Sequence, residues 1–171
     1  MNGRTGTFRR RRALEVSLDA VLDTAERALR RGHGRAAYRL VGQVLTLEPR
    51  QARAMELLSR IALDQGSVFD ALAYLQRALE IEPDRANWHH AMGVMCRQTG
   101  RYADAAAALR TAIRLRPYRA ESMVELALAL SAVGVREDAE YWAARALQIN
   151  PKLQDARDLL DHLVAQGMDA A

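Results

Sequence analysis

The chain has 171 residues, of which 50% are hydrophobic and 27% are charged, the composition of a globular domain and not of a disordered segment. No apolar run approaches the roughly 20 residues of a membrane span, and no signal-peptide core follows the basic N-terminus, so we expect no membrane insertion and a cytoplasmic location. The single cysteine, Cys96, cannot form an internal disulfide.

The N-terminal segment is basic, because five of the first twelve residues are arginine and none is acidic. We expect residues 1–12 to form a flexible arm, followed by a helix from Arg12 or Ala13 to Arg31. Leu14 and Leu18 give that helix an apolar face wider than one partner helix covers. We therefore expect both leucines to contact another protein or a second copy, which makes a homo-oligomer one of the predicted assemblies.

Glycine and proline divide the rest of the chain with one common period of 34 residues. The prolines are Pro49, Pro83, Pro117 and Pro151, and the glycines, each 17 residues earlier, are Gly32, Gly66, Gly100 and Gly134. Glycine ends a helix in a left-handed conformation, and proline moves the residue before it away from helical geometry. The pattern predicts pairs of helices of about 14 residues, separated by short turns.

Small residues repeat with the same period on both helices of each pair. They are Ala25, Ser59, Gly93 and Ala127 on the first helices, and Ala37, Ala71, Ala105 and Ala139 on the second. Larger side chains there would force the helices beyond the usual separation of roughly 8–10 Å. We expect closely packed antiparallel hairpins and an all-α fold.

The 34-residue unit resembles the tetratricopeptide repeat, most closely in the phrases GRYADAAAALRTAIRLRP and AYLQRALEIEP. The resemblance implies a right-handed α-solenoid of four units, with Thr24 marking the first as the least typical. The predominance of arginine over lysine favours a bacterial source. The predicted units are residues 18–51, 52–85, 86–119 and 120–153, followed by a capping helix over 152–166 and a flexible tail over 167–171.

No motif for catalysis, metal binding or a cofactor emerges from the sequence. His89, His90 and Cys96 could suggest a metal site, but neighbouring residues on a helix point about 100° apart, so packing is the favoured role. We predict that the protein is not an enzyme and needs neither a metal nor another cofactor.

The tetratricopeptide resemblance implies that a ligand lies along one stripe of the first helices. Arg60, His90 and Arg97 would hold its polar groups, while Val94, Val124 and Leu128 would supply apolar contact. The stripe begins with Leu22 and Glu26. The predicted partner-binding residues are Arg53, Glu56, Arg60, Asn87, His90, Val94, Arg97, Glu121, Val124 and Leu128.

These patterns predict a non-catalytic scaffold or adaptor that binds a peptide or helical segment of another protein. A clamp for acidic C-terminal tails, as in co-chaperones of this family, is disfavoured, because acids such as Glu56 and Glu121 occupy positions that need donors. One alternative is nucleic-acid or anionic-surface binding through the arginine arm, which we disfavour because the rest of the chain has no basic excess. Another is a substrate-recognition subunit of an enzyme complex.

Overall fold

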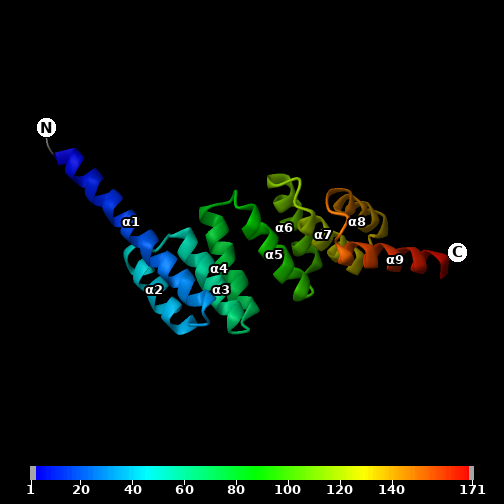
Figure 1. The fold of residues 1–171 in the computed structure, drawn as a ribbon, viewed down its shortest axis with the longest axis horizontal. Coiled ribbons are helices and arrows are strands. Elements are labelled where there is room, and N and C mark those ends of the chain that lie inside the picture. The colour runs from blue at the N-terminus through cyan, green and yellow to red at the C-terminus, as the bar shows by residue number, and fades with distance from the viewer. Residues whose placement is uncertain (1–2, 170–171) are drawn as a thin grey trace. The chain divides into compact units, whose positions relative to one another are not determined.

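The computed structural model describes the backbone of residues 3–169 and the side chains of residues 17–165. Over this range the chain forms nine α-helices and no strand, which confirms the all-α prediction (Figure 1). The helices are α1 (Gly3–Arg30), α2 (Gly34–Leu47), α3 (Ala52–Asp64), α4 (Val68–Ile81), α5 (Ala86–Gln98), α6 (Tyr102–Leu115), α7 (Ala120–Ala132), α8 (Arg136–Ile149) and α9 (Gln154–Asp169).

The periodic glycines end the first helix of each hairpin. Gly32, Gly66, Gly100 and Gly134 have φ angles of 77°, 78°, 75° and 77°. In the first turn the His33 amide donates to the Ala28 carbonyl and the Gly32 amide to the Leu29 carbonyl, both at 2.9 Å. This is the hydrogen-bond pattern of a glycine C-cap, and it confirms the turns expected from the sequence.

The periodic prolines follow the second helices. Helices α2, α4, α6 and α8 each end two residues before a proline, as the restriction on the residue preceding proline requires. The small residues lie in the hairpin interfaces, where Ala25, Ala71, Ala105 and Ala139 are each fully buried. The residues that repeat every 34 positions therefore lie where the two helices of a hairpin pack together and where they end.

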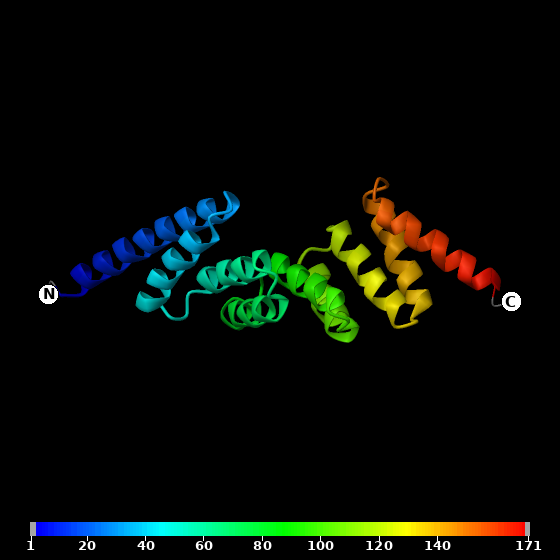
Figure 2. The same cartoon turned by 90° about the horizontal axis from the view of Figure 1, so that it is seen from below.

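Two compact units make up the chain, Met1–Pro83 and Asp84–Ala171. In the first, α1 packs against α2 and α3, and α3 packs against α4. In the second, α5 packs against α6 and α7, while α7 also contacts α6, α8 and α9. Figures 1 and 2 both show α1 beside α2, and α9 beside α8.

The two ends differ from the predicted boundaries. Helix α1 begins at Gly3, about ten residues before the expected start, so residues 3–12 of the predicted flexible arm have a helical backbone. No proline interrupts this stretch, and arginine is a good helix former. Helix α9 continues to Asp169, beyond the predicted end at 166 and into the expected tail. Its Ala156, Leu159 and Leu163 are buried, and Leu160 is half-buried.

Candidate functional site

In the first unit, an ion-pair network covers the face shared by α1 and α3. Arg53 Nη2 lies 2.5 Å from Asp23 Oδ1 and 3.2 Å from Glu26 Oε2, and Arg53 Nη1 lies 3.8 Å from Asp19 Oδ1. The hydrogen bond from Arg53 holds the pKa of the Asp23 carboxyl below its ordinary value. One predicted binding arginine is thus surrounded by the protein's own acids.

Arg60 extends the same network. Its Nη1 donates to Glu26 Oε1 at 3.1 Å and lies 3.8 Å from Glu56 Oε1. The hydrogen bond from Arg60 lowers the pKa of Glu26, whereas burial raises the pKa of Glu56. The structure therefore brings Arg53, Glu56 and Arg60 together as predicted neighbours, but both arginines are already paired with carboxylates.

In the second unit, polar side chains join α5 to α7. His90 Nδ1 and Ser122 Oγ share a hydrogen bond of 3.0 Å, and Ser122 is fully buried. Burial lowers the pKa of the His90 imidazole, with the charge of Arg119 acting in the same direction. Arg97 Nε donates to Glu125 Oε2 at 2.7 Å. These two bonds fix the α5–α7 face, which we define by Asn87, His90, Val94, Arg97, Glu121 and Leu128.

Asn87 lies exposed at one end of this face. Its Oδ1 accepts hydrogen bonds from Arg119 at 2.7 Å and from Arg116 at 3.2 Å, which holds the carboxamide in place. The amide nitrogen keeps two donors that have no partner among the described residues. Glu121, also exposed, has its carboxylate 3.9 Å from Arg119 Nε. Asn87 thus offers a fixed pair of donors to an incoming group.

Two of the predicted stripe residues are not on the surface. Val124 is 5% exposed and Leu22 is fully buried, so the prediction that they contribute to a binding stripe is wrong. Helix α7 packs against four other helices and is therefore apolar nearly all round, which hides Val124. Val94 and Leu128 are half-buried and remain at the α5–α7 face.

Leu18 and Leu14 are the two residues that we predicted to contact another chain. Leu18 is 4% exposed and belongs to the core formed by α1, α2 and α3, so the expectation of an outward contact there is wrong. Helix α1 contacts α3 as well as α2, and Leu18 lies in one core cluster with residues of both of these helices. The side chain of Leu14 lies outside the described residues.

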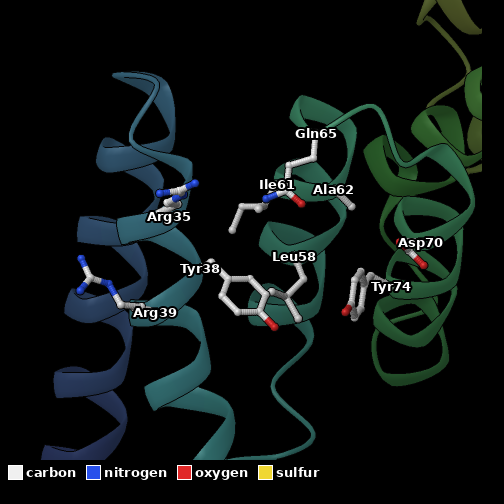
Figure 3. Close-up of a pocket in the computed structure, with 9 residues that line it drawn as sticks. All are labelled: Arg35, Tyr38, Arg39, Leu58, Ile61, Ala62, Gln65, Asp70 and Tyr74. Carbon is white, nitrogen blue, oxygen red and sulfur yellow. The ribbon is translucent and has the colours of Figure 1, made fainter.

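A groove between α2, α3 and α4 was not anticipated. It encloses about 740 Å³, and Figure 3 shows its residues projecting from these three helices. Its lining residues are Arg35, Tyr38, Arg39, Leu58, Ile61, Ala62, Gln65, Asp70 and Tyr74. The sequence signal that could have found it is Arg35 followed, one helical turn later, by Tyr38 and Arg39, all on the exposed side of α2.

Sites for other chemistry are not apparent among the described residues. Within residues 17–165, no group of three or more His, Cys, Asp or Glu side chains is placed to hold a metal ion. Cys96 is buried, and burial raises the pKa of its thiol, which disfavours the nucleophilic thiolate. No helix in the described part of the chain is long and apolar enough to cross a membrane.

Comparisons with known proteins find a matching family and solved structures with the same helical-repeat fold. Residues 50–117 match the tetratricopeptide repeat family. Among solved structures, MamA from Desulfovibrio magneticus RS-1 superposes with a TM-score of 0.82 at 17% identity, covering 89% of this chain and 86% of that chain. PilF from Pseudomonas aeruginosa gives 0.78 at 19% identity, covering 91% and 71%.

A third likeness, to an O-GlcNAc transferase from Thermobaculum terrenum, has a TM-score of 0.69 at 24% identity. It covers 78% of this chain but only 26% of the transferase. A search of curated proteins gives no significant match. At these identities the solved structures establish the fold alone.

Proposed function

Because the chain is a tetratricopeptide repeat protein, we propose that it is a non-catalytic scaffold that binds a segment of another protein on the α5–α7 face. The observation that carries this proposal is Asn87, an exposed carboxamide whose oxygen is held by Arg116 and Arg119. A fixed carboxamide can donate to the carbonyl groups of an extended chain without first losing much side-chain entropy.

The rest of the face supplies the other contacts. Glu121 is exposed and offers an acceptor, while half-buried Val94 and Leu128 give a small apolar surface between the polar groups. His90 and Arg97 are engaged by Ser122 and Glu125, so we assign them mainly to positioning the two helices. The expected ligand is a segment with backbone carbonyls free for Asn87, a basic or amide side chain for Glu121, and one apolar anchor.

The first unit is a weaker candidate by this reasoning. A ligand carboxylate would have to compete with Asp19, Asp23 and Glu26 for Arg53, and with two glutamates for Arg60. Breaking such a network leaves charges unpaired, and the free energy lost exceeds what a single surface ion pair with the ligand contributes. We therefore assign Arg53, Glu56 and Arg60 to the packing of α1 against α3 and leave them out of the proposed binding surface.

The test is an isosteric substitution. Asn87→Asp removes the two donors but keeps an oxygen for Arg116 and Arg119, so helix content and melting temperature should not fall. Loss of the donated hydrogen bonds, roughly 1–1.5 kcal/mol, should weaken partner binding about tenfold. The partners are those captured by the tagged full-length wild type from its native cell, with each affinity then measured on the purified pair.

Asn150→Asp is the matched control, because it makes the same chemical change in the α8–α9 turn, where the Asn150 oxygen accepts from the Lys152 amide. Capture by this variant should equal that of the wild type. If Asn87→Asp also binds every captured partner with wild-type affinity, the α5–α7 face is not the binding surface. A captured enzyme would identify the chain as a substrate-recognition subunit.

A further inference from the structure

The groove between α2, α3 and α4 is separate from the α5–α7 face and lies wholly in the first unit. Next to the 740 Å³ cavity lies a second one of about 630 Å³, which reaches the start of α2 at Gly34. Arg35, Arg39, Ile61 and Gln65 line both cavities. The two therefore form one continuous channel along α2, which we call the α2–α4 groove.

Its walls have distinct chemistry. The floor is apolar and comes from α3, where Leu58, Ile61 and Ala62 are nearly buried but still reach the cavity. On the α2 wall, Tyr38 is 53% exposed between Arg35 and Arg39, and neither arginine has an ion-pair partner among the described residues. An apolar floor beside two unpaired cations suits an amphipathic segment with acidic side chains.

The opposite wall limits how such a segment can lie. Asp70 and Tyr74 project from α4, across the groove from the arginines (Figure 3). Asp70 accepts a hydrogen bond of 2.6 Å from the Ser67 hydroxyl and so keeps its carboxylate at that wall. Asp64 lies at the other end, in the second cavity. Like-charge repulsion from both acids would turn the acidic side of a bound segment toward α2.

The size of the groove fits a helix. A volume of 740 Å³ lies within the range of roughly 300–1,000 Å³ found for sites that enclose whole ligands, and is far larger than one side chain needs. Helix α2 has 14 residues, and a groove along it is on the order of 20 Å long. An amphipathic helix of about four turns would fill that length.

The chain itself carries a helix of this kind. Helix α9 has 16 residues and buries one side, through Ala156, Leu159 and Leu163, against its own unit. Its other side exposes Val164, at 54%, beside half-buried Leu160 one turn earlier. Around the helix, exposed Asp161 lies next to Val164, exposed Asp158 lies further round, and exposed Asp155 lies on the side opposite Val164.

The N-terminal part of the chain has an excess of basic residues, and the C-terminal part has an excess of acidic ones. Residues 1–47, which include α1 and α2, contain ten arginines and four acidic residues. Residues 136–169, which include α8 and α9, contain seven acidic and four basic residues. Helix α9 itself has four acidic residues and one arginine, so Arg35 and Arg39 of the groove would attract it.

We propose that the α2–α4 groove of one molecule binds helix α9 of a second copy. Asp158 and Asp161 face Arg35 and Arg39, and Leu160 with Val164 covers the apolar floor near Tyr38. Such a contact joins two different surfaces, so it can be repeated from copy to copy and does not stop at a dimer.

Sedimentation velocity on the full chain tests the proposal. At low salt the wild type should show a weight-average mass that rises above 19.1 kDa with concentration, and the mass should fall as salt is added. Arg35→Glu with Arg39→Glu should be monomeric, as should Asp158→Arg with Asp161→Arg. All four residues are exposed, so unchanged melting curves should show that both variants are folded.

The matched control is Arg110→Glu with Arg114→Glu, the same charge change at the same spacing on the exposed face of α6. It should assemble as the wild type does. Mixing the two monomeric variants should restore assembly, because each groove then meets an α9 of opposite charge.

Three results would overturn the proposal. The first is a wild type that stays at 19.1 kDa up to high micromolar concentration. The second is a folded groove variant that still assembles, and the third is a mixture of the two variants that remains monomeric. A monomeric wild type whose groove instead binds an acidic segment of another protein would likewise exclude the second copy as the occupant.

Discussion

Replacing Gly93 with alanine should separate helices α5 and α6. A Cβ atom built on Gly93 would lie 2.4 Å from Leu109 Cγ, and 2.9 and 3.0 Å from the two Cδ atoms. The closest contact is the branch point of the Leu109 side chain, which rotation about χ2 does not move, and Leu109 is fully buried, which leaves little room for another χ1 rotamer. The added methyl group must instead push the two helices apart.

The expected size of the effect combines two opposing terms. Overpacking a core costs about 1–3 kcal/mol, and the severe overlap here favours the upper end. Alanine stabilises a helix by about 1 kcal/mol relative to glycine. The net loss is about 2 kcal/mol, which should lower the melting temperature by about 4–8 °C for a protein of this size.

Gly42→Ala is the matched control, because Gly42 is exposed in the middle of α2 and a Cβ there meets nothing within 4 Å. Only the helix-propensity term remains, so this variant should melt about 2–4 °C above the wild type. Thermal unfolding followed by circular dichroism compares the two. If Gly93→Ala is as stable as Gly42→Ala, then α5 and α6 do not approach as closely as the structure shows.

Three further perturbations test the charges and turns described above. Glu26→Gln should lower the free energy of unfolding by about 0.5–1 kcal/mol at pH 7. Because the pKa of Glu26 is lowered in the folded protein, the difference between wild type and variant should vanish when urea unfolding is measured at a pH below that pKa. The pKa of His90 is also lowered, so wild-type stability should fall as the pH drops below about 6.5, the ordinary pKa of an imidazole. His90→Asn should flatten this fall in the same titration, and an unchanged slope would contradict it. Gly100→Ala, at φ 75°, should cost about 1 kcal/mol, while Gly34→Ala, in a helix with open space around it, should not.

The repeat was predictable because the residues that define it act locally. A glycine with positive φ and a proline each set the backbone of their own turn, whatever packs around them. Gly66 and Pro83 therefore mark the ends of α3 and α4 closely. Small residues such as Ala71 and Ala105 were equally informative, because a hairpin interface admits no larger side chain.

The surface was harder to predict because exposure depends on helices far away in sequence. Val124 occupies a stripe position, yet it is buried in a helix that packs against four others. Leu18 is likewise buried, in a cluster with residues of α2 and α3. The pairing of Arg53 with Asp23 also depends on how α1 lies against α3, which a period of 34 residues does not specify. The α2–α4 groove likewise requires three helices to be placed before it exists.

Site-specific photo-crosslinking tests the central claim, that the α5–α7 face holds the partner. A benzoylphenylalanine in place of Glu121 would sit exposed on α7, and one in place of Arg114 would sit equally exposed on α6. In the native cell, the residue at position 121 should crosslink to one segment of a partner protein, and Asn87→Asp in the same chain should weaken that crosslink. Equal crosslinking to the same segment from position 114, or a crosslink from position 121 that Asn87→Asp leaves unchanged, would contradict the account.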